Sequence, residues 1–187
     1  MEVNAISSTF PGIVNEIITD VLVSNPITGE WLKTKAIWDT GATSCVITNS
    51  AASKLNLPVM SKATVHGVHG DKDVNVHYVN LKLNNENIEL TNFVTVCDEL
   101  SPDGTVGVLI GMDLITKGDL CITNHSGQTV MTFRVPSIET VNFVREIEEE
   151  NKYFKIHESW KAHGDQRCPC GSGKKYENCH GRSKYHI

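Results

Sequence analysis

Two short stretches of the chain bring together side chains that can do chemistry, and the first is Asp39-Thr40-Gly41-Ala42. It follows an apolar run and places one carboxylate inside a turn of small residues. Gly41 permits backbone geometry that a Cβ would forbid, and Ala42 leaves the floor of the turn shallow. Hydrolysis of a peptide bond by carboxylates alone needs two of them, one protonated and one ionised. The chain has a single Asp-Thr-Gly, so the second carboxylate has to be accounted for.

The second stretch lies near the C-terminus and is rich in cysteine. Cys168, Cys170, Cys179 and His180 supply three thiolates and an imidazole, a ligand set suited to tetrahedral zinc. The Gly-Ser-Gly sequence between them permits a tight turn. So short a segment has no core of its own, and a bound metal would supply its folding energy. Four protein ligands close the site, which predicts structural zinc; the alternative is a flexible tail that binds nothing.

The residues between these stretches predict mainly short β-strands, which must position the carboxylate. A short polar lead precedes the first strand, and turn signals rich in Gly, Pro and Asn separate the others. Strands are expected at 13–24, 31–39 and 88–100 and at the starts of 45–58 and 106–120, with hairpins at 62–85 and 120–135. Short helices are expected before Pro58 and after Gly111. Many short strands with frequent turns are typical of an all-β barrel or sandwich.

From Ser137 the pattern changes to that of a helix. Ser137 is a suitable N-cap, and the sequence then becomes rich in glutamate. The predicted helix extends to about Ala162. Apolar residues recur along it at helical spacing, at Ile138, Val141, Val144 and Ile147.

Composition is that of a globular protein and limits the partners to be expected. Of the 187 residues, 40% are hydrophobic and 21% charged, and the net charge of −5 argues against nonspecific binding to nucleic acid or anionic lipid. Residues 1–136 carry −6 and residues 137–166 carry −3, whereas residues 167–187 carry +4 and so form a separate basic module. No secretory leader and no membrane span are visible. Thiols crowded beside a histidine indicate a reducing compartment, so we expect a cytoplasmic protein.

The first stretch and its surroundings resemble the retropepsins, the retroviral-type aspartic proteases and their cellular relatives. After Asp39-Thr40-Gly41-Ala42 come Thr43-Ser44 and, later, Val108-Leu109-Ile110-Gly111-Met112-Asp113. That family has a fixed order of elements: paired strands, the Asp-Thr-Gly turn, a glycine-tipped flap hairpin and an apolar-apolar-Gly motif. Residues 13–135 of this chain have the same order. The resemblance implies a closed β-barrel that pairs two identical subunits, so that the second carboxylate is Asp39 of another copy.

The resemblance also implies roles for individual residues. Asp39, Thr40 and Gly41 would form the catalytic turn, in which one ionised carboxylate activates a water and the protonated one polarises the scissile carbonyl. The flap would bind the peptide as an added strand. The expected substrate-binding residues are Ala42, His66, Gly67, Val68, His69 and Gly70. The alternatives are a structural role for Asp39 and an ordinary exposed hairpin in place of the flap.

Other side chains of these types are expected to serve structure. Asp113 follows a glycine at a helix start, which favours a role at the helix N-terminus over chemistry. Three histidines are expected on the surface or in the flap: His66, His69 and His77. Three cysteines are expected as buried small apolar residues: Cys45, Cys97 and Cys121.

The C-terminal stretch resembles the SEC-C motif, named for the C-terminus of the translocation ATPase SecA. The pattern C-P-C-G-S-G-K-K-Y-x-x-C-H-G matches along nearly its full length. SEC-C tails generally recruit partners. The basic side chains of this one suit an acidic protein surface, or a ribosome or other RNA: Lys174, Lys175, Arg182 and Lys184.

Three segments with one joint function are therefore expected. Residues 10–136 would form a retropepsin-like aspartic protease domain, residues 137–163 a helical linker, and residues 164–187 a SEC-C zinc-binding motif. The favoured function is a homodimeric aspartic endopeptidase that hydrolyses peptide or protein substrates, with the zinc tail recruiting a substrate or partner. Two alternatives stay open. One is a non-catalytic dimeric binding module that presents two tails, and the other is an RNA- or ribosome-associated adaptor.

Overall fold

The computed structural model describes residues 2–67, 70–148, 150–151, 165–168 and 170–179. The chain divides into two compact units, Met1–Glu139 and Thr140–Ile187. Across the described ranges, no helix has the length and apolar character needed to cross a bilayer. The first unit consists mainly of β-strands, which confirms the predicted fold class.

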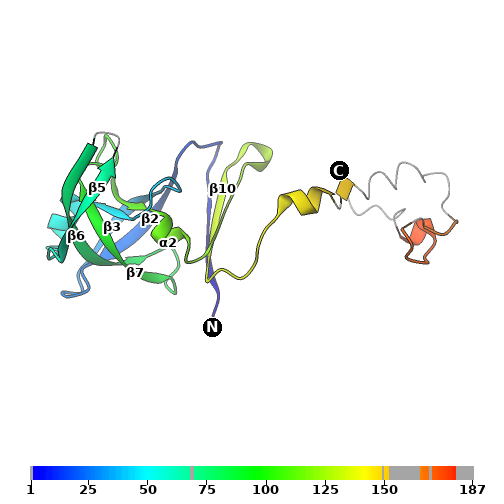
Figure 1. Ribbon diagram of the computed structural model, residues 1–187, viewed down its shortest axis with the longest axis horizontal. Coiled ribbons are helices and arrows are strands. Elements are labelled where there is room, and N and C mark those ends of the chain that lie inside the picture. The colour runs from blue at the N-terminus through cyan, green and yellow to red at the C-terminus, as the bar shows by residue number, and fades with distance from the viewer. Residues whose placement is uncertain (1, 68–69, 149, 152–164, 169, 180–187) are drawn as a thin grey trace. The chain divides into compact units, whose positions relative to one another are not determined.

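Seven strands of the first unit form one sheet in the order β2-β3-β8-β4-β7-β6-β5. Their bounds are β2 (Ile17–Ser24), β3 (Trp31–Trp38), β4 (Val46–Thr48), β5 (Ser61–Gly67), β6 (Gly70–Lys82), β7 (Glu89–Cys97) and β8 (Val106–Ile110). β2 pairs with β6 as well as with β3, so the sheet closes into a ring with β5 outside it (Figure 1). The β3–β8 and β4–β7 pairs are parallel and the other pairs are antiparallel. The predicted closed barrel is thus a ring of strands with mixed pairing.

A second, three-stranded sheet has the order β1-β10-β9. It contains β1 (Asn4–Thr9), β9 (Asp119–Thr123) and β10 (Val130–Val135), and Figure 1 shows β10 beside the N-terminal strand. The sequence predicted no strand in the polar lead, which is wrong for residues 4–9. Ile6 is the one buried side chain of β1, so the strand lacks the apolar alternation by which strands are recognised. Its pairing with β10 over six residue pairs stabilises it instead.

Buried side chains from both sheets form one core, which reaches the base of the Asp39 turn. Trp38 ends β3 and packs edge-to-face on Phe133 of β10, with ring centroids 5.1 Å apart. The indole Nε1 of Trp38 donates to Thr19 Oγ1 at 2.9 Å, so its polar atom is satisfied inside the core. The residue before Asp39 is therefore held by packing and by a buried hydrogen bond.

Two short helices lie where the sequence predicted them. α1 (Asn49–Lys54) follows β4, and the Thr48 hydroxyl caps it by accepting from Ala51 N at 3.2 Å. α2 (Met112–Ile115) follows Gly111, with no side-chain cap. A 3₁₀ turn, η1 (His125–Gly127), joins β9 to β10.

The helix after β10 begins later than predicted. Residues 137–142 are not helical, and the described helical residues are 143–148 and 150–151. Asn142 caps this helix, because its Oδ1 accepts from the N–H groups two and three residues further on, at 3.1 and 3.3 Å. The predicted N-cap at Ser137 is therefore wrong. The predicted continuation toward Ala162 lies outside the described residues.

Ser137 is instead part of a cluster around Asp119. The carboxylate of Asp119 accepts from the Ser137 hydroxyl, from Arg134 Nη2 at 2.6 Å and from the N–H of Ile138 at 3.1 Å. These bonds favour the ionised form and lower the pKa of Asp119 to about 2, with the Ser137 bond as the largest cause. The cluster fastens the chain beyond β10 to the start of β9.

Candidate active site and metal site

Asp39 lies in the turn directly after β3. Its N–H donates to Ile110 O at 3.0 Å, which ties the turn to the end of β8. Its Oδ1 accepts from Gly41 N at 2.8 Å. A Cβ on Gly41 would lie 3.2 Å from that oxygen, so glycine allows the close approach. Asp39 is half-buried, and no partner of its second carboxylate oxygen is found in the described part of the chain.

The segment around Gly111 holds the rest of the turn. The two N–H groups after Gly111 donate to the carbonyl oxygens of Ala42 and Thr43, at 2.8 and 3.1 Å. A Cβ on Gly111 would lie 2.6 Å from the carbonyl carbon and oxygen of Ser44. Glycine is therefore required at 111, because the backbone of the Asp39 turn passes directly over it.

Asp113 ties the end of the turn to β7. Its Oδ2 accepts from Cys45 N at 3.1 Å and from Asn92 Nδ2 at 2.8 Å, and its Oδ1 accepts from the Cys45 thiol at 3.0 Å. Burial and the bond to Asp113 raise the pKa of Cys45 to about 12, so the thiol stays protonated as a donor. Asp113 lies in the first turn of α2, as predicted, and its carboxylate also bonds to Cys45 and Asn92. Cys45 is buried, as predicted, yet it is hydrogen-bonded rather than simply apolar.

A cleft of about 300 Å³ opens beside Asp39. We call it the Asp39 cleft, and its lining residues are Asn15, Glu16, Ile17, Ile37, Trp38, Asp39, Thr40, Leu120 and Ile122. Thr40 is exposed, and no bond of its hydroxyl is found among the described residues. The sequence did not predict the contributions of Asn15, Glu16, Leu120 and Ile122. They lie far from Asp39 in the chain, and only strand pairing brings them near.

The predicted flap hairpin is present as β5 and β6. The two strands pair from Ser61↔Val76 to Gly67↔Gly70, and Gly70 has a φ of +100°, which favours glycine. Val68 and His69 lie outside the described residues. The backbone of His66 belongs to β5, but its side chain is not described.

The remaining histidine and cysteines differ in part from expectation. His77 was predicted on the surface or in the flap, but it is only 5% exposed and its Nδ1 lies 2.7 Å from Pro58 O. It faces inward because β6 continues beyond the flap into the core. Cys97 and Cys121 are half-buried rather than buried.

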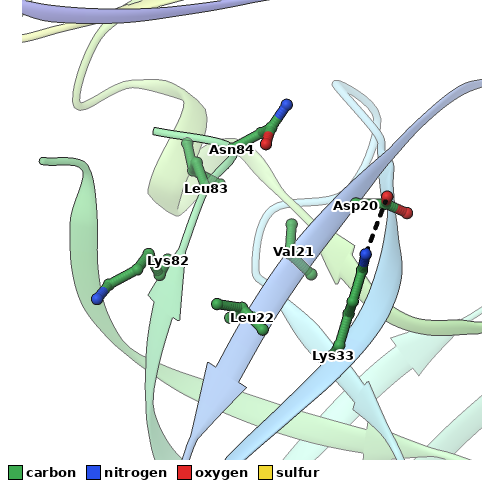
Figure 2. Close-up of a pocket in the computed structure, with 7 residues that line it drawn as sticks. All are labelled: Asp20, Val21, Leu22, Lys33, Lys82, Leu83 and Asn84. Atoms are coloured by element: carbon green, nitrogen blue, oxygen red, sulfur yellow. Dashed lines mark ion pairs between the residues drawn. The ribbon is translucent and has the colours of Figure 1, made fainter. Parts of the chain in front are cut away.

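A second hollow, of about 190 Å³, lies between β2, β3 and the end of β6 (Figure 2). It is lined by Asp20, Val21, Leu22, Lys33, Lys82, Leu83 and Asn84. Its charged side chains are paired with one another or with neighbours. Lys33 Nζ lies 3.7 Å from Asp20, and Lys82 Nζ lies 3.6 Å from Glu89 and 4.8 Å above the Trp31 ring. None of the predicted site residues lines this hollow.

The three predicted cysteine ligands come together in the second unit. The sulfurs of Cys168, Cys170 and Cys179 all lie within 4.8 Å of one another, and those of Cys170 and Cys179 are 3.6 Å apart. Two thiolates on one tetrahedral zinc stand about 3.8 Å apart, given Zn–S bonds of about 2.3 Å, so the spacing fits such a metal. The Ser172 hydroxyl, 3.2 Å from Cys170 Sγ, is the largest of the causes that lower the pKa of Cys170 to about 6. The fourth predicted ligand, His180, lies outside the described residues.

The backbone around the cysteines explains how the sulfurs converge. Gly171 and Gly173 have φ values of +79° and +72°, and Cys168 N donates to Lys174 O at 2.8 Å across the tight turn that they make. Tyr176 starts the 3₁₀ turn η2 (Tyr176–Asn178) and is buried. Lys174 and Lys175 are exposed, whereas Arg182 and Lys184 lie beyond the described residues.

Two family models match segments of the chain. The aspartyl protease family matches residues 26–114, which include the Asp39 turn, the flap hairpin and most of α2. The SEC-C motif matches residues 166–182, which include the cysteine cluster. Both predicted resemblances are thereby confirmed. No curated protein matches the chain significantly.

Solved structures similar to this chain are distant in sequence. A retropepsin-like aspartic protease from Rickettsia conorii is 13% identical, with a TM-score of 0.45, and covers 72% of this chain and 97% of its own. The EIAV protease in complex with an inhibitor is 19% identical, with a TM-score of 0.40, covering 54% and 86%. The retroviral protease-like domain of Ddi1 from Leishmania major is 17% identical, with a TM-score of 0.40, covering 65% and 94%.

Proposed function

We propose that this chain, which joins an aspartyl protease match to a SEC-C motif, is an aspartic endopeptidase that works as a homodimer. The observation that carries the proposal is the Asp39 turn. One carboxylate oxygen is held by Gly41 N at 2.8 Å, and the carboxylate lines a cleft of about 300 Å³. A purely structural aspartate would have no need of an open cleft.

The proposed chemistry needs Asp39 from each of two copies. The Asp-Thr-Gly turn occurs once in the chain, at Asp39, so one copy supplies one of the two aspartates that the proposed mechanism uses. Two carboxylates in contact share a proton, because both cannot ionise at close range. The ionised one takes a proton from water, which attacks the scissile carbonyl while the protonated one polarises it. We assign the exposed hydroxyl of Thr40 to the contact between the copies, beneath the pair.

The substrate would lie between the Asp39 turn and the flap hairpin. An extended peptide can bond to the hairpin backbone as an added strand, which recognises peptides by their main chain. The glycines at Gly67 and Gly70 allow the hairpin tip to approach a peptide closely. The proposed substrate-binding residues are Ala42, His66, Gly67, Val68, His69 and Gly70.

The C-terminal tail would bind one structural zinc and recruit a partner or substrate. Cys168, Cys170 and Cys179 would hold the metal together with His180, and zinc bound there would fix the fold of a segment that has almost no core. The exposed Lys174 favours an acidic protein surface as the partner. We place the protein in the cytoplasm, where such thiols stay reduced. The proposed segments are a protease domain at 10–136, a linker at 137–163 and the tail at 164–187.

A non-catalytic adaptor is the second candidate, and the SEC-C match is the observation that favours it. In that case the protease fold would serve only to dimerise and to present two tails. Contact of the tail with a ribosome or other RNA stays a prediction. The adaptor has no need of the carboxylate, so a single substitution separates the two functions.

The test is digestion of a diverse peptide library by the full chain, wild type beside Asp39→Asn. We expect wild type to cleave and Asp39→Asn to be inactive, because the substitution removes the acid–base pair while keeping side-chain volume. Asp20→Asn makes the same chemical change on the exposed face of β2 and should keep wild-type activity. Equal cleavage by wild type and Asp39→Asn, or none by either, would favour the adaptor.

A further inference from the structure

Glu16 is the second carboxylate of the Asp39 cleft. Apart from Asp39 it is the one charged side chain among the nine lining residues, and none of the nine is Lys, Arg or His. The other walls are largely apolar, from Ile17, Ile37, Trp38, Leu120 and Ile122. The cleft is thus an apolar slot with negative charge and no cation of its own.

Glu16 and Asp39 lie just beyond the paired ends of β2 and β3, and both line the cleft. β2 and β3 pair antiparallel, and the last pair is Ile17↔Trp38. Glu16 directly precedes Ile17 and Asp39 directly follows Trp38, so each is one residue away from this pair. The segment before β2 is itself anchored, because Val14 N donates to Thr129 Oγ1 at 3.1 Å. The backbone that carries Glu16 is therefore held close to the cleft.

The carboxylate of Glu16 is available for a ligand. Glu16 is exposed, and it has no hydrogen bond or ion pair with any other described residue. The acidic side chains elsewhere on this unit include several that do have partners, such as Asp20 with Lys33 and Asp119 with Arg134. An open carboxylate above an apolar slot suits a side chain with a long apolar stem and a cationic head.

Lysine and arginine side chains combine a long apolar stem with a cationic end group. The stem can pack on Leu120 and Ile122, the latter 44% exposed, while the ammonium or guanidinium bonds to Glu16. We propose that Glu16 determines specificity, selecting peptide substrates that carry a lysine or arginine beside the scissile bond. This inference rests on the proposed endopeptidase function and names its substrate class.

The test compares peptides that differ at one position. A frame peptide that the enzyme cleaves is made with lysine, norleucine or glutamate at each position flanking the cleaved bond, and kcat/KM is measured with the full chain. Norleucine has the unbranched stem of lysine without its charge. At the position that meets Glu16, we expect lysine to exceed norleucine by about tenfold, since a charged hydrogen bond of this kind is worth about one factor of ten.

Variants then assign the preference to Glu16. Glu16→Gln should reduce the ratio of lysine to norleucine to near one, and Glu16→Lys should reverse the preference toward glutamate, an inversion that loss of structure cannot produce. Glu30→Gln removes an exposed carboxylate from the turn between β2 and β3, outside the cleft, and should keep the wild-type ratio.

The possible failures are distinguishable. Cleavage by wild type with equal rates for all three side chains at every position would overturn this inference and leave the endopeptidase function intact. A lysine preference that survives in Glu16→Lys would overturn it as well. If Glu16→Lys changes the dimer's sedimentation but not its preference, Glu16 serves the contact between copies and the inference is wrong. No cleavage of any peptide by wild type would contradict the proposed function itself.

Discussion

Replacing Asp113 by alanine should destabilise the first unit through the loss of three hydrogen bonds. The carboxylate accepts from Cys45 N at 3.1 Å, from the Cys45 thiol at 3.0 Å and from Asn92 Nδ2 at 2.8 Å. A hydrogen bond to a charged acceptor contributes about 1.5–3 kcal/mol, but Asp113 is half-buried and the thiol is a weak donor. We therefore expect a loss of about 3 kcal/mol in the free energy of unfolding.

Thermal and urea unfolding of the full chain, followed by circular dichroism, measure this loss. For a unit of this size, about 3 kcal/mol corresponds to a fall in melting temperature of about 10 °C. Asp113→Asn is the matched control, because it keeps one acceptor oxygen and nearly the same volume. It should lose about 1 kcal/mol.

The same bonds hold the Asp39 turn, so under the proposed endopeptidase function Asp113→Ala should also lower kcat of the folded protein more than it raises KM. Two results would refute the reasoning. One is a change in unfolding free energy below about 0.5 kcal/mol, the range of neutral surface substitutions. The other is equal destabilisation by alanine and asparagine, which would mean that the acceptor oxygens do not matter.

Three further predictions concern acid stability, the glycine under the turn and the metal. The pKa of Asp119 is lowered from 3.8 to about 2 in the folded chain, so its stabilisation is complete above about pH 4 and is lost as the pH falls toward 2. Asp119→Asn should make the free energy of unfolding depend less on pH between about pH 4 and pH 2. An unchanged pH dependence in the variant would contradict this. Gly111→Ala should lower the free energy of unfolding, measured with urea, by about 1–3 kcal/mol, because a Cβ would lie 2.6 Å from backbone atoms of Ser44. A variant as stable as wild type would show that the backbone of the turn can move to accommodate the methyl group. Wild type should bind about one zinc per chain, measured by elemental analysis, and replacing Cys168 and Cys170 together by serine should abolish this binding. The far-ultraviolet circular dichroism of the β-unit should stay unchanged. Zinc retained by the double variant would rule out the site.

The strands that were predicted correctly carry their own local signal. β-branched and alternating apolar residues identify β2, β3, β6, β7 and β8, and the Gly-containing turns between them bound the hairpins. β1 was missed because it has one buried side chain and depends on pairing with β10. The predicted start of the helix after β10 was wrong because both Ser137 and Asn142 are good N-caps. Ser137 is instead engaged by Asp119, a partner 18 residues away that the local sequence does not reveal.

The candidate site likewise contains residues that the local sequence reveals and residues that only long-range contacts bring together. The Asp39 turn could be predicted because Asp, Gly and Ala stand together in the chain and their geometry is local. Glu16 and Asn92 could not, because the register of β2 on β3 and the packing of β7 on the Asp113 carboxylate are set by long-range contacts. His77 was misjudged because histidine is polar, whereas its position in β6 is buried, as is that of its neighbour Val76.

The central claim is that two copies of Asp39 make one active site, and subunit mixing tests it most directly. Wild type is incubated with a ninefold excess of Asp39→Asn until subunits exchange, and peptide cleavage is compared with wild type diluted to the same concentration in buffer. Random pairing leaves roughly a tenth of the wild-type chains with a wild-type partner, so activity should fall to roughly a tenth of the control. Activity that the excess variant leaves unchanged, with exchange verified by differently labelled subunits, would show that one copy suffices and would contradict the account.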